Sequence, residues 1–250
     1  MSTYTKRDSL FLSGSYPVPF EFNKNVVDVF DDMISRSVPL YGMVNSAIVD
    51  WTQRYYIEGT KIIDIGCSTG NTLLLMGTKI QDKKFKALGF DLSSPMIDRA
   101  KEKLKDIREK TSTFNHDIEF SVKDAFNVDY SGSSVVIINY TLQFINKEKR
   151  SQLLKKIYEK MLPGGILFIS DKVLSDWDEF SVVEKDSYEN FKESQGYSKM
   201  EIARKRQALE NVLVPLRFSE QLDLIRNAGF LKVEPIIRWN NFLSVVSKKD

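Results

Sequence analysis

The sequence predicts an α/β domain in which helices cover both faces of a mostly parallel sheet. Apolar strand-like runs alternate with helical patterns from about residue 61 to residue 170, as in parallel sheets. A glycine-bounded loop follows the first run, and the second run stops at Asp91. In nucleoside-binding α/β units such a loop lets backbone approach the ligand, and such an acid lies beside a ribose. The chain is therefore predicted to use an adenosine-containing small molecule.

Each element of this fold has its own signal. Residues 1–57 are read as an irregular arm followed by helices at 25–36, closed by Pro39, and at about 43–56. Pro95, placed just after Ser93, is a good start for a helix, and Pro163-Gly164-Gly165 ends another. The expected strands are residues 61–65, 86–90, 118–122, 135–139 and 166–170, with helices near 72–80, 95–110 and 147–161 between them.

The pattern changes after residue 175. Residues 176–213 are polar and helical, and they are followed by a helix at about 219–228 and apolar runs at 231–237 and 242–246. We interpret the block as a helical insertion before a final β-hairpin. Ligands of open α/β sheets bind at the carboxyl edge, where this insertion begins. It is therefore the expected substrate lid of a single domain that spans residues 1–250.

The composition argues against several classes of protein, among them membrane-spanning, disulfide-linked and nucleic-acid-binding proteins. The 250 residues carry 36 Lys and Arg against 34 Asp and Glu, and a net charge of +2 gives little reason to expect nucleic acid or membrane as a partner. Cys67 is the single cysteine, so no internal disulfide can form. The amino-terminal residues do not resemble a signal peptide, and no run approaches the roughly 20 apolar residues of a membrane span. We expect a cytoplasmic protein.

The first glycine loop favours a carboxylate over a pyrophosphate. Gly66 and Gly70 bracket Cys67, Ser68 and Thr69 after the first strand. Gly66 allows a tight turn, and the next helix offers free N–H groups at its start. Ser68 occupies the second glycine position of a dinucleotide fingerprint, and its hydroxyl suits the amino-acid end of S-adenosylmethionine. A plain strand–loop–helix junction with two glycines is the structural alternative.

Polar residues end three later strands. Asp91 lies 25 residues after Gly66, close to the spacing of a ribose-binding acid, with a helix N-cap as its structural alternative. Asp124 with the Ala125 backbone could reach an adenine amino group, or could be a surface turn. Asn139 ends an apolar strand at the carboxyl edge and is expected to face the ligand.

Histidine and cysteine chemistry is not expected. His116, the only histidine, is placed on the surface between a helix and a strand, and Cys67 has no nearby histidine partner. One histidine and one cysteine exclude a conventional His/Cys metal cluster, so we predict no metal.

The basic run Arg204-Lys205-Arg206 has two interpretations. A solvated helix face is one. An arginine on a lid, pairing with an anionic substrate through its planar fork, is the other. Arg36 is a second candidate for such a role, and Tyr41 could cover the sheet edge.

The chain resembles the carboxy-S-adenosylmethionine synthases over about residues 7–230. The matching segments are RDSLF, VFDDMISRSVPLY, DIGCSTG, SPMIDRA, NYTLQF, LPGGILFISDK, GYSKMEI and KRQALENVL. The resemblance implies the Rossmann-like, seven-stranded sheet of class I S-adenosylmethionine-dependent methyltransferases, and a homodimer. It also implies that S-adenosylmethionine and prephenate give carboxy-S-adenosylmethionine and phenylpyruvate. A separate tRNA carboxymethyltransferase would then use the product in wobble-uridine modification, so no direct nucleic-acid contact is expected.

The resemblance also carries site residues onto this sequence. Tyr41 would contact the ligand, and Gly66, Cys67 and Ser68 would hold the methionine end. Asp91 and Leu92 would bind ribose, although the family pattern has Asn where this chain has Leu92. The remaining implied residues are Asp124 and Ala125 beside adenine, Asn139 near the sulfonium, and Arg206, which would pair with the new carboxylate as the catalytic residue.

Three other functions remain open from sequence. An ordinary methyltransferase acting on a small molecule or tRNA would share the ligand half. A non-catalytic carrier of carboxy-S-adenosylmethionine would share it too. A nicotinamide-dependent oxidoreductase is disfavoured by Ser68 in the glycine loop.

Overall fold

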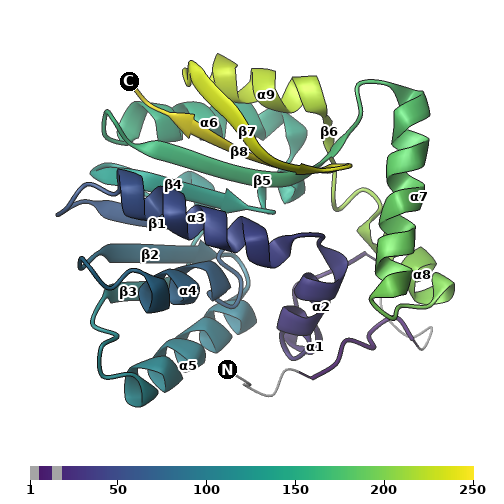
Figure 1. Cartoon of the computed structure of the whole chain (residues 1–250), viewed down its shortest axis with the longest axis horizontal. Coiled ribbons are helices and arrows are strands. Elements are labelled where there is room, and N and C mark those ends of the chain that lie inside the picture. The colour runs from purple at the N-terminus through teal and green to yellow at the C-terminus, as the bar shows by residue number, and fades with distance from the viewer. Residues whose placement is uncertain (1–5, 13–18) are drawn as a thin grey trace.

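The computed structural model describes residues 6–12 and 19–250, so part of the expected amino-terminal arm lies outside the described residues. Its core is a sheet with strand order β3-β2-β1-β4-β5-β8-β7 (Figure 1). β1 to β5 are parallel, and β8 runs antiparallel to both β5 and β7. The strands are β1 (Lys61–Ile65), β2 (Lys86–Asp91), β3 (Asp117–Val122), β4 (Ser133–Asn139), β5 (Ile166–Leu174), β6 (Leu216–Arg217), β7 (Lys232–Trp239) and β8 (Phe242–Lys248).

The helices cover the two faces of this sheet. The α-helices are α1 (Lys24–Val27), α2 (Phe30–Ser37), α3 (Tyr41–Tyr55), α4 (Asn71–Lys79), α5 (Ser94–Lys110), α6 (Lys147–Lys160), α7 (Asp178–Ser194), α8 (Lys199–Leu209) and α9 (Phe218–Asn227), with 3-10 turns η1 (Ala125–Asn127) and η2 (Leu142–Phe144). α3, α4 and α5 share one apolar cluster with the sheet, whereas α6 and α9 share another. The predicted α/β class with helices on both faces is therefore confirmed.

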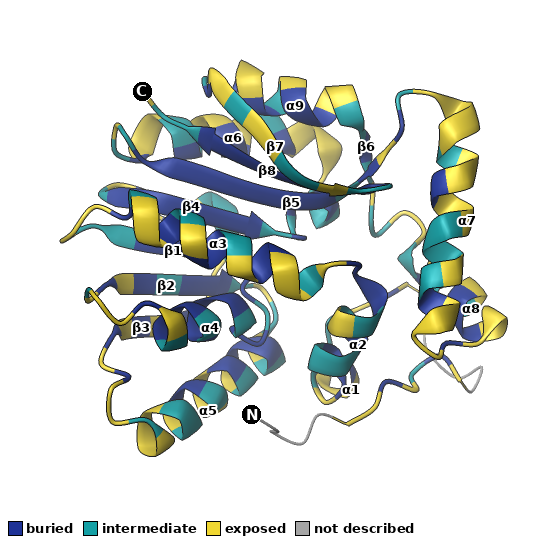
Figure 2. Cartoon of the chain, in the orientation of Figure 1, coloured by how far each residue is buried: buried dark blue, intermediate teal, exposed yellow. Residues whose placement is uncertain are grey.

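Strand alternation explains how both faces are apolar. Ile62 of β1 packs into the cluster of α3, α4 and α5, and its neighbour Ile63 packs into the cluster of α6 and α9. Successive side chains of a strand point to opposite faces, so a strand covered on both sides must be apolar throughout. Figure 2 shows the central strands almost wholly buried and α7 largely exposed.

One expectation about elements was wrong in detail. The single helix expected at residues 25–36 is divided into α1 and α2, because Val29 leaves the helical path at φ −116° and ψ 1°. Val26, Val29 and Phe30 are buried on both sides of the break. The expected seven-stranded sheet is present, and the two-residue β6 pairs in parallel with the end of β5, off the main strand order.

The predicted insertion forms α7 and α8. Both lie at the end of the sheet where β5 leads into α7, and α1 and α2 lie at the same end (Figure 1). Ser198 begins α8 with a capping box, in which its side chain accepts from the Glu201 N–H and Glu201 reaches back.

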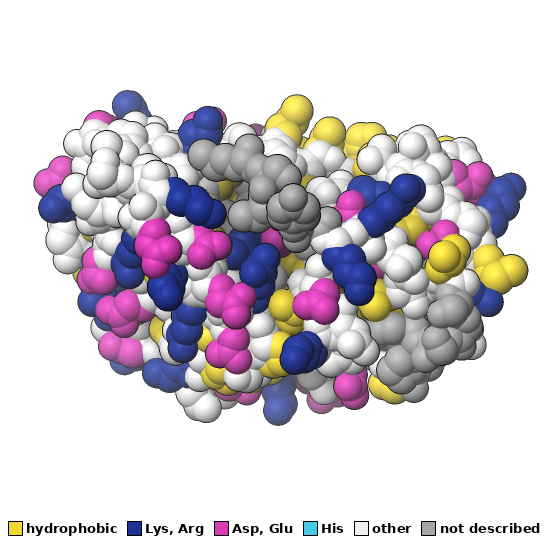
Figure 3. All heavy atoms as spheres, turned by 90° about the horizontal axis from the view of Figure 1, so that it is seen from below, with side chains coloured by type: hydrophobic (Ala, Val, Ile, Leu, Met, Phe, Trp, Pro, Cys, Tyr) yellow, Lys and Arg dark blue, Asp and Glu magenta, His cyan; other side chains and the backbone are white. Residues whose placement is uncertain are grey.

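The surface is mixed in charge where Figure 3 displays it. Basic and acidic side chains are interspersed over the left part of that view. Among the residues that the structure describes, every helix is too short or too polar to cross a lipid bilayer.

Candidate functional site

A cavity of about 1180 Å³ opens at the carboxyl edge of the sheet. Strand ends of β1, β2 and β4 form its floor, and residues from α2, α3, α7 and α8 enclose it. The ten residues to which the family resemblance assigned a ligand role all line this cavity: Tyr41, Gly66, Cys67, Ser68, Asp91, Leu92, Asp124, Ala125, Asn139 and Arg206. The structure thus brings them together, and their individual ligand roles stay predictions.

The glycine loop is fixed against the neighbouring strand. The N–H groups of Gly66 and Cys67 both donate to the Phe90 carbonyl, at 2.7 and 3.0 Å. Gly66 has φ +70°, and a Cβ at this position would lie 2.1 Å from Thr141 Oγ1. Glycine is therefore required here both by the backbone angle and by the close approach of Thr141.

Asp91 joins the loop to the second strand. Its Oδ2 accepts from the Ser68 N–H at 3.0 Å, and its Oδ1 accepts from the Ser93 N–H at 2.9 Å. Burial raises the pKa of Asp91, although these hydrogen bonds oppose the shift. Ser93, rather than Asp91, caps α5 through its side chain, so the N-cap alternative for Asp91 is wrong.

Asp64 is an acidic residue to which the sequence assigned no ligand role. It lies in β1, lines the cavity, and is 1% exposed. Its Oδ2 has no hydrogen-bond partner in the described part of the chain. Burial, with the charge of Asp91 adding to it, raises the pKa of Asp64 to about 7. A charged residue inside the otherwise apolar run IIDI, residues 62–65, was the available signal.

The other residues predicted to bind the ligand differ in whether their polar groups already have partners within the protein. Asp124 accepts from the Phe126 N–H at 2.8 Å and caps η1. Leu92 is 71% exposed at the cavity rim. Asn139 Oδ1 is buried without a partner among the described residues. Burial raises the pKa of Tyr41 to about 12. Asn139 is therefore the one whose polar group most needs a ligand.

The opposite side of the cavity is basic. From β5, α7 and α8 the lining residues are Lys172, Lys185, Lys192, Arg204, Lys205 and Arg206, against Glu189 and Glu210. Arg206 pairs with Glu189 at 2.7 Å, and its side chain is 56% exposed. The cavity thus has an acidic wall at the sheet edge, where Asp64, Asp91 and Asp124 line it beside Lys123 and Lys149, and a basic wall at the insertion.

The basic run is not simply a solvated face. Arg204 donates to the carbonyls of Phe11 and Leu12, at 3.0 and 2.7 Å, and so holds the amino-terminal arm against α8. Lys205 donates to Ser37 Oγ at 2.7 Å, and burial lowers its pKa to about 8. Arg206 is the exposed member.

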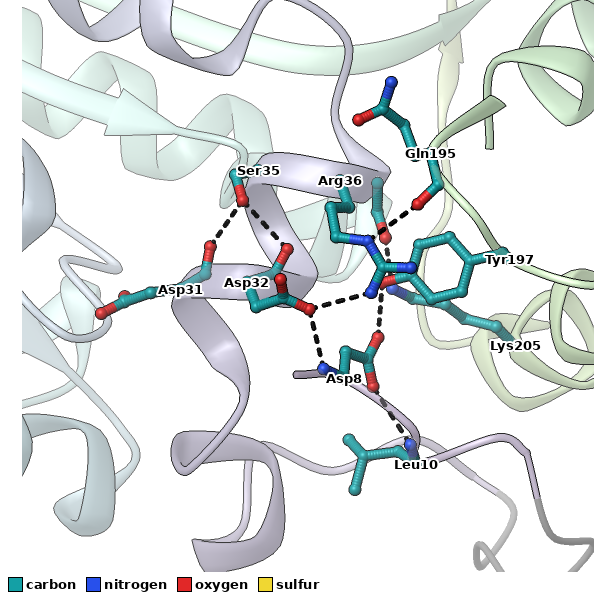
Figure 4. A network of polar contacts seen from close by, with 10 residues as sticks. Asp8, Leu10, Asp31, Asp32, Ser35, Arg36, Gln195, Tyr197 and Lys205 are labelled. Carbon is teal, nitrogen blue, oxygen red and sulfur yellow. Dashed lines mark hydrogen bonds and ion pairs between the residues drawn. The ribbon is translucent and has the colours of Figure 1, made fainter. Parts of the chain in front are cut away.

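Arg36 belongs to a clasp outside the cavity, and not to its lining (Figure 4). It donates to Asp32 Oδ2 and to the Gln195 carbonyl, both at 2.9 Å, and its guanidinium lies 4.2 Å from the centre of the Tyr197 ring. Tyr197 in turn donates to Asp8 Oδ2 at 2.6 Å. These contacts tie α2 and the amino-terminal arm to the insertion, so Arg36 does not face a ligand.

The expectation for His116 was wrong. Its side chain is buried, with 4% exposure, and stacks 4.0 Å from the ring of Phe85. Burial lowers its pKa, which favours the neutral ring. Cys67 is also buried, and burial raises its thiol pKa, so the thiolate nucleophile is disfavoured. Within residues 6–12 and 19–250, no group of three or more His, Cys, Asp or Glu side chains could hold a metal ion.

Comparison with solved structures places the fold. A structure of human N-acetylserotonin methyltransferase with S-adenosylmethionine is similar with a TM-score of 0.59 and 16% identity, over 90% of this chain and 55% of that one. An O-methyltransferase family protein from Burkholderia thailandensis gives a TM-score of 0.63 and 17% identity, over 92% of this chain and 61% of the other. This chain therefore spans less than two thirds of those proteins. At such identities the likeness concerns the fold alone.

Sequence comparison is more specific. The methyltransferase-domain family matches residues 62–165. Proteins called carboxy-S-adenosyl-L-methionine synthase are 46% identical in Trichodesmium erythraeum, 42% in Campylobacter fetus and 38% in Desulforapulum autotrophicum. These matches cover 98%, 92% and 98% of this chain, and 94%, 94% and 97% of the relatives. On this similarity over almost its whole length, the chain belongs to the carboxy-S-adenosyl-L-methionine synthase family.

Proposed function

We propose that this enzyme converts S-adenosylmethionine and prephenate into carboxy-S-adenosylmethionine, phenylpyruvate and water. Prephenate loses its ring carboxylate as CO2 and its hydroxyl as hydroxide when the ring becomes aromatic. The hydroxide takes a proton from the sulfonium methyl group, and the resulting ylide carbon forms the new bond to CO2. Atoms and charge balance without an external oxidant or a metal.

The two-sided cavity is the observation that carries this proposal. Its acidic wall, with Asp64, Asp91 and Asp124, suits the ammonium, sulfonium and ribose hydroxyls of S-adenosylmethionine. Its basic wall suits a second substrate with two carboxylates. A plain methyl transfer would leave two basic lining residues, Lys172 of β5 and Lys192 of α7, without an explanation.

The protein's part in this chemistry would be positioning and charge stabilisation. Arg206 would hold the carboxylate that becomes attached to the methyl carbon, because a guanidinium fork matches a carboxylate. The insertion would act as a lid that excludes water, which would otherwise protonate the ylide. Holding both substrates in contact removes the entropy of bringing them together during the reaction.

The family membership supports further proposals about the enzyme's setting. The protein would be cytoplasmic and homodimeric. It would pass its product to a tRNA carboxymethyltransferase acting on wobble uridine, and would not contact tRNA itself. A conventional S-adenosylmethionine-dependent methyltransferase is the second candidate, favoured by the methyltransferase-domain match over residues 62–165.

Mass spectrometry of the nucleoside product tests the reaction. Purified protein is mixed with S-adenosylmethionine, with and without prephenate, and we expect a gain of one CO2 that requires prephenate. S-adenosylmethionine left unchanged by protein that binds it would exclude the synthase. Methyl transfer to an acceptor would establish the methyltransferase, and tight retention of carboxy-S-adenosylmethionine without turnover would indicate a carrier.

Variants of Arg206 test its assigned role in the same assay. Arg206→Ala should lose most carboxylation, at least about a hundredfold, while keeping its affinity for S-adenosylmethionine. Arg206→Lys should also be poor, because a point charge does not reproduce the planar fork. Equal loss of carboxylation and S-adenosylmethionine binding in Arg206→Ala would contradict the role.

A further inference from the structure

Two lysines on the basic wall share one aromatic platform. The ammonium group of Lys172, from β5, lies 4.9 Å from the centre of the Tyr188 ring, and that of Lys192, from α7, lies 4.2 Å from it. Both side chains line the cavity. Lys192 is 6% exposed as a residue, although lysine is rarely buried to this extent without a partner.

Neither ammonium group has a hydrogen-bond or ion-pair partner in the part of the chain that the structure describes. The nearby carboxylate, Glu189, is bound to Arg206 at 2.7 Å. Lys205, also nearby, donates a hydrogen bond to Ser37 Oγ. Burying two like charges side by side without an anion is unfavourable, so this corner of the cavity is suited to an anionic ligand.

The platform is held rigidly before any ligand arrives. Tyr188 donates its hydroxyl to the Ser37 carbonyl at 2.9 Å, and its ring packs 4.9 Å from that of Phe242 in β8. The backbone N–H of Lys172 donates to Gln143 Oε1 at 2.9 Å. Lys172 also pairs with Phe242 in the sheet register. Two cations set on a fixed ring form a preorganised anion site, which loses little entropy on binding.

We propose that Lys172 and Lys192 bind the carboxylate that the dicarboxylate co-substrate keeps, while Arg206 binds the carboxylate that is transferred. This assignment depends on the proposed synthase reaction. It divides the two negative charges of prephenate between two sites of different geometry. Because phenylpyruvate still carries the kept carboxylate, the lysine pair should bind the product as well.

The electrostatics of the corner support this division. Burial, together with repulsion from Lys172 and Lys205, lowers the pKa of Lys192 to about 7, with Glu189 opposing and Arg206 adding to the shift. Burial likewise lowers the pKa of Lys172. A bound carboxylate would restore the charged form of both lysines. The affinity for prephenate should therefore fall as pH rises through about 7, because the empty site then loses its charge.

Neutral variants of the two lysines test the assignment kinetically. Lys172→Met and Lys192→Met keep much of the side-chain length but remove the charge, and Lys199→Met is the matched control, on an exposed position of α8 outside the cavity. We expect the prephenate KM to rise about tenfold or more in both lysine variants. The Kd for S-adenosylmethionine should stay within about twofold of the wild-type value, which also shows that each variant is folded.

Phenylpyruvate binding separates the two carboxylate sites without any turnover. Isothermal titration is performed on protein saturated with S-adenosylhomocysteine. Lys172→Met and Lys192→Met should weaken phenylpyruvate binding, whereas Arg206→Ala should leave it nearly unchanged. Equal weakening by Arg206→Ala, loss of S-adenosylmethionine binding in the lysine variants, or a prephenate KM equal to that of Lys199→Met would overturn the assignment.

The proposal and the function on which it depends fail in different ways. If the wild-type protein shows no prephenate-dependent gain of CO2, the synthase reaction is wrong. If the wild-type protein is active but the lysine variants behave like Lys199→Met, the reaction stands and the lysine assignment alone is wrong.

Discussion

Asp64 is a buried carboxyl group whose protonation can be coupled to ligand binding. Its pKa of about 7 results from burial and from the neighbouring charge of Asp91, and its Oδ2 has no partner in the described structure. A raised pKa means that the empty folded protein favours the protonated acid, and this contribution to stability is lost as pH rises towards 7. A cation placed in the cavity would reverse that preference.

The affinity for S-adenosylmethionine should therefore increase with pH. The cationic ligand favours ionised Asp64, so its Kd should fall several-fold between about pH 5.5 and 7.5. Isothermal titration across this range measures the effect. Asp64→Asn is the matched variant, and it should flatten the dependence and weaken binding at pH 7.5. Parallel pH profiles in the two proteins would show that Asp64 does not contact the ligand.

At the scale of residues, the sequence predicted where the cavity lies better than it predicted which side chains line it. Gly66, Asp91 and Asn139 could be found because the carboxyl ends of neighbouring parallel strands must meet at one edge. Lys192 could not, because its position depends on how α7 packs across the sheet edge. His116 looked like a loop residue in TSTFNHDIEF, and its burial depends on stacking against Phe85.

The glycine loop between β1 and α4 lies against the floor of the cavity, and its backbone path depends on Gly66. Two independent restraints act on Gly66 there, a φ of +70° and the side chain of Thr141. Gly59 has a similar φ of +79°, but no atom lies within 4 Å of a Cβ placed on it. The two glycines therefore separate the effect of backbone angle from that of crowding.

Gly66→Ala should destabilise the protein more than Gly59→Ala does. The backbone angle alone should cost about 1 kcal/mol at either position. Crowding by Thr141 should add about 1–3 kcal/mol at Gly66, and the displaced loop should weaken S-adenosylmethionine binding. Urea denaturation and ligand titration measure both effects. Thr141→Gly in the Gly66→Ala background should recover the crowding part, and equal destabilisation by the two alanine variants would argue against crowding.

Elements built on local signals were predicted well, and elements built on packing were not. Ser93 and Pro95 are direct sequence signals for the start of α5, and Gly164 is one for a turn. The break between α1 and α2 has no such signal, because residues 25–36 have continuous helical spacing and only the backbone angles at Val29 separate the two segments. β6 is too short to give any sequence pattern.

Across the whole molecule, the cavity is assembled from three segments far apart in sequence. The sheet edge supplies the acidic wall, the insertion supplies most of the basic wall, and α2 and α3 lie between them. The clasp of Asp8, Arg36 and Tyr197 joins the arm and α2 to the insertion (Figure 4). The position of the basic wall over the acidic one therefore depends on contacts outside the cavity itself.

Loosening the clasp should affect the second substrate more than the first. Tyr197→Phe keeps the ring under Arg36 but removes the hydroxyl that donates to buried Asp8, a hydrogen bond to a charged group that contributes about 1.5–3 kcal/mol. The free energy of local opening should fall in α7 and α8, and not in the sheet. Hydrogen exchange should therefore accelerate in the insertion, and the KM for prephenate, the proposed second substrate, should rise several-fold while the Kd for S-adenosylmethionine changes little. Tyr158→Phe, on α6 and outside the cavity, is the matched control. If Tyr197→Phe raises both constants equally, or leaves exchange in α8 unchanged, the clasp does not position the basic wall, and α7 and α8 must be held by their own packing.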